Sequence, residues 1–353
     1  MGIEMEPFDK ILDSLVISPE MLRSVAQLED FKGQWQALGG LAPERLRGLK
    51  RVATIESIGS STRIEGARLS DAQVETLLSS ISTQSFRSRD EEEVAGYARV
   101  MDLVFESWRE LTLREGHLKQ LHRELLFHST KDARHRGEWK ALPNHLEAFD
   151  PEGRSLGIIF ETASPFDTPR QMETLLTSTS EELAARRHHP LFVIGTFVVR
   201  FLAIHPFQDG NGRLSRALTT LLLLRAGYDF VPYASLERVI EENKDSYYRA
   251  LRRAQTDESR LGEWVSFFLR CLVAQKDVLA RRVERERLLT SLTPLEEQVL
   301  NLTRERGHLT LAEAVTLTQA NRNTLKRSLR ELVKKGHLRL LGAGRGARYE
   351  GAR

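Results

Sequence analysis

Residues 205–216 read HPFQDGNGRLSR and decide how the rest of this 353-residue chain is interpreted. Asp-Gly and Asn-Gly are ordinary turn dipeptides, so each piece alone is typical of a loop between two helices. The two glycines, Gly210 and Gly212, also let successive backbone N–H groups point inward at the start of a helix that we expect near Gly212. The segment therefore predicts a nest for an anion, and phosphate is the expected anion.

The side chains around this nest suit phosphate chemistry. Arg213 and Arg216 are three residues apart and share one face of the first helical turn. Their positive charge is unfavourable at this end of the helix dipole, so the arrangement makes sense chiefly if an anion binds there. Asp209 offers a hard oxygen ligand for Mg²⁺ beside the same phosphates. His205 can accept a proton from a hydroxyl near neutral pH. This combination favours transfer of a phosphorus-centred group from a nucleotide.

The segment matches every fixed position of the Fic-family signature, H-P-F-x-[DE]-G-N-G-R-x-x-R, and so resembles that family. The resemblance implies an all-α core and transfer of AMP from ATP to a Ser, Thr or Tyr hydroxyl of a protein, with release of pyrophosphate. The intact glycines favour nucleotidyl transfer over the phosphoryl transfer of kinase-like relatives. The implied roles are the base for His205, the Mg²⁺ ligand for Asp209, the phosphate cradle for Gly210, Asn211 and Gly212, and the grip on the outer phosphates for Arg213 and Arg216.

The segments around the motif fit the same resemblance. We expect Phe207 to be buried as a core anchor under the loop. A hairpin between Asn144 and Phe160, with a Pro-Glu-Gly turn, resembles the family's flap, whose free edge would pair with an extended stretch of the target. Residues 136–140, RGEWK, resemble the R-G-x-aromatic-R segment that precedes the flap, with Lys140 where Arg is usual.

Downstream, a helix predicted over Glu237–Leu251 carries a Tyr-Tyr pair that would ordinarily be half core and half surface. The family resemblance of its pattern, E-N-x-x-x-Y-Y-x-x-L, makes this helix one wall of an adenine pocket. The residues assigned to that wall are Asn243, Tyr247 and Tyr248.

Residues 57–66, SIGSSTRIEG, predict the end of a helix at about residues 52–66, capped by Gly66. Alone, the pattern is typical of a helix with a small-residue face and a solvated Glu65. Ser61 and Glu65 share a face because they are four apart. The stretch also resembles the Fic inhibitory motif, [ST]-x-x-x-E-[GN]. The resemblance implies that Glu65 pairs with Arg216 in the place of the γ-phosphate and inhibits the ground state.

Composition, with 41% hydrophobic and 29% charged residues, indicates a globular chain of two or three domains. Leucines repeat at spacings of three and four, so we expect a mostly α protein. The predicted domains are an N-terminal helical region at 1–90, a catalytic core at 91–288 and a C-terminal domain at 289–353.

The last domain resembles a winged helix-turn-helix, with the helix Asn321–Lys335 in the recognition position. From Ser291 onward there are 12 Lys and Arg against 6 Asp and Glu, while the preceding residues have a slight acidic excess. Binding of DNA and a role in dimerisation or protein docking are both open at this point. The candidate DNA contacts are Arg322, Asn323, Lys326, Arg327 and Arg330.

Three further features bear on the compartment. The single cysteine, Cys271, cannot form an internal disulfide, which fits a reducing environment. The N-terminal segment lacks an apolar core of signal-peptide length. The apolar stretch Leu191–Ile204 is too short for a bilayer and contains Arg200, so it predicts a buried core helix. We expect a cytoplasmic protein without a membrane partner; a homodimer is an open alternative.

Three functions are compatible with these patterns. The first is an autoinhibited protein adenylyltransferase that uses ATP and Mg²⁺ and also modifies itself. The second is a DNA-binding regulator in which the nucleotide site acts as a sensor. The third is removal of AMP from a modified protein, where Glu65 would position a water molecule. Nucleotides other than ATP remain open as donors.

Overall fold

The computed structural model describes residues 6–37, 43–80, 86–149, 155–290, 292–342 and 347–351, and they are mostly helical, as predicted. The chain divides into two compact units, residues 1–279 and 280–353. The boundary falls inside one helix, α12 (Leu261–Thr290), whereas the sequence interpretation placed it near the end of that helix. None of the helices in these ranges is long and apolar enough to cross a bilayer.

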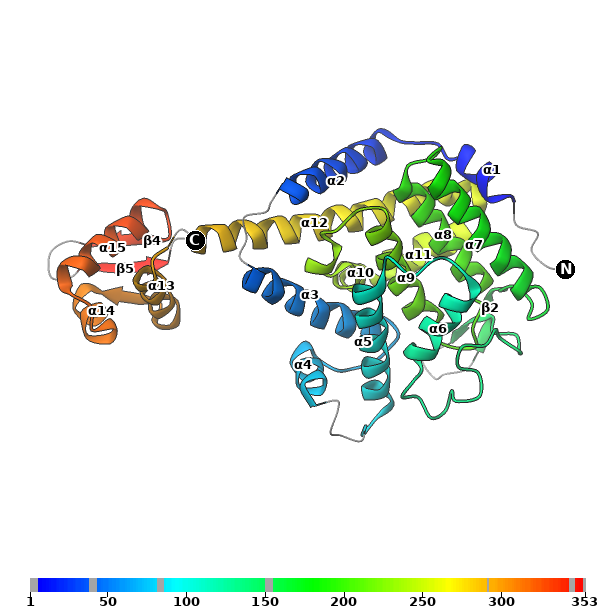
Figure 1. The fold of residues 1–353 in the computed structure, drawn as a ribbon, viewed down its shortest axis with the longest axis horizontal. Helices are drawn as coiled ribbons and strands as arrows, with labels where there is room; N and C mark the ends of the chain where they lie inside the picture. The colour runs from blue at the N-terminus through cyan, green and yellow to red at the C-terminus, as the bar shows by residue number, and fades with distance from the viewer. Residues whose placement is uncertain are drawn as a thin grey trace. The chain divides into compact units, whose positions relative to one another are not determined.

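The first unit is built around two central helices, α8 and α9, which pack against each other and are buried along almost their whole length (Figure 1). The helices of this unit are, in chain order, α1 Phe8–Asp13, α2 Pro19–Ala37, α3 Pro43–Ile64, α4 Asp71–Ser80, α5 Arg89–Ser107, α6 Glu115–Leu125, α7 Thr168–Ala185, α8 Pro190–Ile204, α9 Asn211–Arg225, α10 Leu236–Glu242, α11 Lys244–Thr256 and α12, with short 3₁₀ turns at η1 Val231–Tyr233 and η2 Glu258–Arg260.

The motif joins the two central helices. Helix α8 ends at His205, which takes a left-handed conformation with φ 53°, and α9 begins after Gly210, with φ 80°. A positive φ is easily adopted by glycine but costs energy at His205. The two positive φ values therefore make a short, tight loop between the ends of α8 and α9.

Helix α3 ends just before the predicted inhibitory glutamate. The Ala67 N–H donates to the Thr62 carbonyl and the Gly66 N–H to the Arg63 carbonyl, each at 3.1 Å, and Gly66 has φ 110°. These bonds form a Schellman motif, so the glycine stops the helix and makes Glu65 its C-cap. The helix runs from Pro43 to Ile64 rather than over about 52–66, and Gly66 caps it as the sequence predicted.

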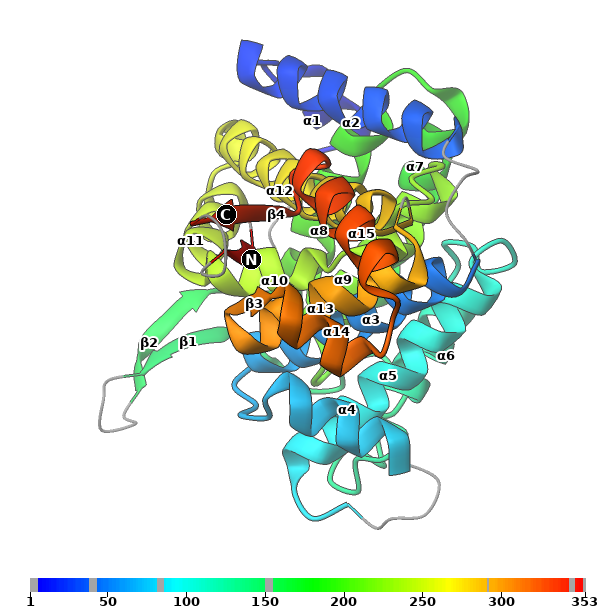
Figure 2. The same ribbon diagram turned by 90° about the vertical axis from the view of Figure 1, so that its left-hand side faces the viewer.

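The predicted hairpin is present as β1 (Leu146–Phe149) and β2 (Ser155–Phe160). The strands are antiparallel, with Leu146 opposite Phe160 and Phe149 opposite Ser155. Figure 2 shows this two-stranded ribbon projecting from the helices of the first unit. The predicted Pro-Glu-Gly turn lies outside the described residues.

Beyond the end of α12, the described residues of the second unit form three helices and a three-stranded antiparallel sheet of order β3-β5-β4. Capping boxes at Thr293 and Thr310 begin its first two helices. Its core contains Val299, Leu309, Leu325, Leu329 and Leu332. The elements are α13 Pro294–Arg306, β3 His308–Thr310, α14 Leu311–Thr318, α15 Arg322–Lys334, β4 Leu338–Leu341 and β5 Arg348–Gly351.

Candidate functional site

A cavity of about 390 Å³ lies over the loop between α8 and α9. Its walls come from these two helices, from α11, from Glu65 at the end of α3 and from Arg89 at the start of α5. The cavity therefore brings together segments that are far apart in the sequence. The sequence-predicted residues that line it are Glu65, His205, Asp209, Gly210, Asn211, Gly212, Arg213, Arg216, Tyr247 and Tyr248.

His205 has one ring nitrogen available to the cavity. Its Nδ1 lies 3.3 Å from the Leu202 carbonyl, so we assign the proton to Nδ1 and the lone pair to Nε2. Burial lowers the pKa of His205 to about 4. The imidazole is therefore neutral near pH 7 and able to accept a proton.

Two side chains beneath the loop hold its backbone. Asn144 donates through Nδ2 to the carbonyls of His205, at 3.1 Å, and Phe207, at 2.7 Å. Lys140 donates through Nζ to Asn144 Oδ1, Thr162 Oγ1 and the Ile204 carbonyl at 2.8–3.0 Å, and burial lowers its pKa to about 8. The lysine that departs from the family pattern thus ties the end of α8 to the segments that flank the hairpin. Asn144 had no sequence signal as a loop-holding residue.

Phe207 is fully buried, as predicted, and packs between two rings. Its centroid lies 3.8 Å from that of His122 and 4.9 Å from that of Trp139. Asn211 accepts from the Phe207 N–H at 2.9 Å and donates to the Phe207 carbonyl at 2.7 Å. The Asn211 side chain therefore closes the loop, and only its backbone N–H is left for the phosphate role that the resemblance implied.

His122, on α6, supports the loop from below. Its Nδ1 accepts from the Gly137 N–H at 2.9 Å, so its Nε2 carries the proton and donates to the Asp209 carbonyl at 3.0 Å. Burial lowers the pKa of His122 to about 4, which keeps the ring neutral. Sequence reasoning missed this residue, because a histidine on the apolar face of a helix has no local signature of a distant contact.

Arg216 is buried and is bound by the end of α3. Its Nη2 donates to Glu65 Oε1 at 2.8 Å and to the Ser61 carbonyl at 2.9 Å, and its Nε donates to Ser61 Oγ at 2.9 Å. A Cβ atom at Gly212 would lie 2.2 Å from Glu65 Oε1. The Glu65 carboxylate therefore lies against the first turn of α9, where helix N–H groups attract negative charge.

Asp209 and Arg213 form a second charged group. Arg213 is 2% exposed; its Nη2 lies 3.4 Å from Asp209 Oδ2 and its Nη1 lies 3.3 Å from Glu93 Oε2. Its Nε and Nη1 have no hydrogen-bond partner among the described residues. Burial opposes ionisation of Asp209, but Arg213, the Gly210 N–H and Arg89 outweigh it and lower the pKa of the carboxyl. Arg213 thus has donors to spare, and Asp209 is ionised.

The charged group can be tested for its fit to Mg²⁺. Within the described ranges, no three His, Cys, Asp or Glu side chains cluster as a protein-only metal site. Mg²⁺ often takes one or two carboxylates together with phosphate oxygens and water. An ionised Asp209 beside a phosphate-sized anion site fits that donor set.

The α11 wall is aromatic, and one predicted member is missing from it. Tyr247 is buried and Tyr248 is 37% exposed, with ring centroids 5.1 Å apart. Gln255 also lines the cavity, and its buried Nε2 has no partner among the residues described. Asn243 does not line the cavity; it separates α10 from α11 and donates to the Val239 carbonyl at 2.9 Å. The expected single helix over Glu237–Leu251 is therefore two helices.

Comparison with known proteins finds similarity to one family over the centre of the chain. Residues 112–223 match the model of the Fic/DOC family. The curated protein adenylyltransferase Fic of Drosophila virilis is 28% identical over 273 residues, which are 76% of this chain and 50% of the relative. The protein of the same name from Drosophila grimshawi is 28% identical over 231 residues, 64% of this chain and 43% of the relative. The chain thus spans about half the length of these curated relatives.

A solved structure with a similar fold extends over nearly the whole chain. The crystal structure of a Fic family protein from Desulfovibrio desulfuricans superposes with a TM-score of 0.60 at 23% identity. The match covers 95% of this chain and 97% of that one. At this identity the likeness establishes the fold.

Proposed function

We propose that this protein is an autoinhibited protein adenylyltransferase that moves AMP from ATP to a Ser, Thr or Tyr hydroxyl of a protein, itself included. The observation that carries the proposal is the Glu65 carboxylate on Arg216, against the first turn of α9 and in a cavity that also contains a neutral His205. A buried arginine and a helix N-terminus together suit a phosphate group. The Fic/DOC match and the names of the curated relatives support the same reaction.

Each of the cavity residues named above has a separate role in the proposed reaction. The target hydroxyl oxygen attacks the α-phosphorus while its proton moves to Nε2 of His205. The bond from the α-phosphorus to the bridging oxygen of the β-phosphate breaks, and pyrophosphate leaves. Arg213, Arg216 and the N–H groups of Gly212 and its neighbours hold the negative charge on the outer phosphates. Mg²⁺ held by Asp209 would neutralise phosphate charge in the same complex.

The free edge of β2 offers a place for the target. In the described residues β2 pairs only with β1, so its other edge has backbone groups available to an extended peptide. Phe160 at the end of β2 lines the cavity together with His205. A peptide added to this edge would therefore run toward the base.

Glu65 is the inhibitory residue in this proposal. Its carboxylate takes the position that the γ-phosphate needs, and Arg216 cannot serve both groups. Burial works against the charged form of Arg216, but Glu65 and the tyrosines around the guanidinium together outweigh it and raise its pKa. ATP therefore competes with a group that the chain itself supplies, and the ground state is weakly active.

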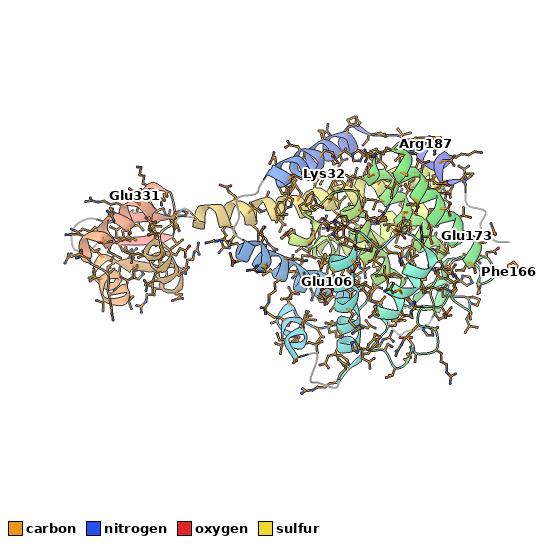
Figure 3. All side chains as sticks on the ribbon, in the orientation of Figure 1. Lys32, Glu106, Phe166, Glu173, Arg187 and Glu331 are labelled. Atoms are coloured by element: carbon orange, nitrogen blue, oxygen red, sulfur yellow. The ribbon has the colours of Figure 1, made fainter. Side chains whose placement is uncertain are left out.

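The test is the variant Glu65→Gly incubated with labelled ATP. Adenylate incorporation should rise about tenfold or more, as expected for loss of a charge-assisted contact of a few kcal/mol. Glu106→Gly is the control, because Glu106, labelled in Figure 3, also lies near the C-terminal end of a helix. Unlike Glu65, it does not line the cavity. Incorporation that stays at the wild-type level would argue against inhibition by Glu65.

Two further arms assign the chemistry. His205→Ala in the Glu65→Gly background should abolish incorporation while nucleotide binding persists, and retained turnover would remove His205 as the base. Wild-type protein incubated with its adenylylated product should leave the modification in place. Release of AMP by the wild type but not by Glu65→Ala would instead indicate the reverse reaction.

A second function, DNA binding by the second unit, is favoured by the surface of α15. Helix α14, a turn at residues 319–321 and α15 are followed by two strands, the order of a winged helix-turn-helix. Glu331, which is partly buried, is the only acidic residue of α15 (Figure 3). The exposed basic residues of α15, none of which makes an ion pair with a described residue, are Arg322, Lys326, Arg327, Arg330 and Lys334.

A salt titration of binding to a random duplex tests this second function. If α15 contacts DNA phosphates, the logarithm of the affinity should fall linearly with the logarithm of salt concentration, with a slope near one per phosphate contact. Absence of duplex binding at low salt would favour docking to a protein instead.

A further inference from the structure

The start of α5 places a second arginine on the predicted metal ligand. Arg89 Nη2 lies 3.1 Å from Asp209 Oδ2, and Arg89 Nε lies 2.7 Å from Glu93 Oε1. Arg89 lines the cavity, although no feature of the motif pointed to it. With Arg213 the four side chains form a ring of alternating charge, in which both arginines approach the same oxygen of Asp209.

The two arginines of this ring differ in their freedom. Arg213 is 2% exposed and is fixed by the packing of α9, whereas Arg89 is 50% exposed and is the first residue of α5. A positive charge at a helix N-terminus opposes the helix dipole. Arg89 is therefore held by Asp209 and Glu93 rather than by its helix, and it can turn toward water at a small cost.

A divalent cation and Arg89 cannot both use Asp209 at close range. Two positive groups on one carboxylate oxygen repel each other, and the repulsion is strong where water is partly excluded. A carboxylate that already has two guanidinium partners is also a weaker ligand. Because Arg213 is locked in place, Arg89 is the group that a cation must displace.

We propose that Arg89 occupies the cation side of the nucleotide site in the resting protein and so sets how much divalent metal is needed before a nucleotide binds. This inference rests on the proposed function of the cavity. Glu65 holds Arg216 on the anion side of the site, and Arg89 holds Asp209 on the cation side. Asp209, which would contact Mg²⁺, and Arg216, which would contact the γ-phosphate, are thus each paired with a side chain of the protein when no ligand is bound.

A hydrogen bond joins the segments that carry Glu65 and Arg89. The Arg68 N–H, three residues after Glu65, donates to Asp90 Oδ2 at 2.8 Å, and Asp90 follows Arg89 directly. The end of α3 and the start of α5 are therefore tied together.

The variant Arg89→Met should separate this role from a merely structural one, because two measured affinities change in opposite directions. Loss of the charge removes the competitor of the cation, so less metal is needed. The same loss removes positive charge from the cavity, so a nucleotide without metal binds more weakly. General damage to the site would weaken both kinds of binding.

The experiment uses the full chain in the Glu65→Gly background with an ATP analogue that has a methylene bridge between the α- and β-phosphates, which cannot transfer AMP. Bound Mn²⁺ is followed by electron paramagnetic resonance, and metal-free binding of the analogue by calorimetry in a chelator. Arg89→Met should lower the half-saturating Mn²⁺ concentration by about threefold to tenfold. It should also weaken metal-free binding.

Arg260→Met is the matched control. Arg260 is 41% exposed, pairs with Asp257 and Glu263 at 3.2 and 3.1 Å, and does not line the cavity. This control should leave both affinities unchanged, and Arg89→Lys, which keeps the charge, should remain near the parent.

Each remaining outcome overturns a defined part of the account. Suppose that the Glu65→Gly protein needs a divalent cation to bind the analogue. If Arg89→Met then leaves the half-saturating Mn²⁺ concentration unchanged, or raises it, only the role of Arg89 is rejected. A parent that binds the analogue without any metal dependence rejects the metal role of Asp209 and the inference with it. A parent that does not bind the analogue rejects the proposed function.

Discussion

The cavity over the loop between α8 and α9 and the surface of α15 both contain several arginines. The arginines of the cavity are buried and ion-paired, whereas those of α15 are exposed to water. Arg213 and Arg216 are 2% and 4% exposed, and each pairs with one carboxylate from a distant segment, Glu93 and Glu65 respectively. The basic residues of α15 are exposed and have no ionic partner in the part of the chain that the structure describes. Burial requires a counter-charge when no ligand is bound, whereas water stabilises an exposed cation. A ligand of the cavity therefore competes with the chain, and a ligand of α15 competes with salt.

The largest effect should come from removing the buried arginine. Arg216→Met in the Glu65→Gly background should lower adenylate transfer by about a hundredfold or more, because charge-assisted bonds to phosphate in a dry site are each worth a few kcal/mol. Steady-state incorporation of labelled adenylate measures it. A variant that keeps more than half of the parent rate would show that the buried arginine is structural, and the contrast with α15 would lose its meaning.

The next effect concerns the buried neutral histidines that support the motif. Burial lowers the pKa of His122 from its ordinary value of 6.5 to about 4. Between these two pH values the histidine is protonated in the unfolded chain but neutral in the folded chain. This stabilisation is complete above the ordinary pKa and is lost on acidification, at up to about 3 kcal/mol for one such group.

Tryptophan fluorescence in urea at several pH values measures this loss for the first unit, since every tryptophan precedes residue 280. The free energy of unfolding should fall between neutral pH and about pH 4. The slope should be shallower in His122→Phe, whatever the variant's stability at neutral pH. An equal slope in both proteins would contradict the assigned neutral state.

The smallest effect is expected on α15. Lys326→Ala should reduce the salt slope of duplex binding by about one unit and weaken binding modestly, because it removes one phosphate contact. Arg304→Ala, which removes an exposed charge from α13, is the control and should leave the slope unchanged. Equal effects of the two variants would mean that only the net charge of the unit matters.

The sequence could predict features that depend on neighbouring residues. The loop between α8 and α9, the burial of Phe207 and the hairpin all follow from local patterns, and the structure has each of them. The contact between Glu65 and Arg216 spans 151 positions, and only the resemblance to a known motif indicated it.

Other parts of the site have no local signal. Arg89, Glu93 and Asn144 reach the motif only because tertiary packing brings their helices and loops to it. The side chain of Asn211 satisfies the backbone of a tight loop, a demand that becomes visible only when the loop is folded. The break at Asn243 likewise depends on how α10 and α11 pack, so the predicted wall of the cavity was partly wrong.

The central claim is that the Glu65 carboxylate and a nucleotide phosphate compete for one place. A crystal structure of Glu65→Gly with Mg²⁺ and the methylene-bridged ATP analogue tests it most directly. The account predicts a γ-phosphate oxygen within hydrogen-bond distance of Arg216, at the position that the carboxylate occupies in the wild type. Nucleotide bound elsewhere, with the first turn of α9 free of phosphate, would contradict it.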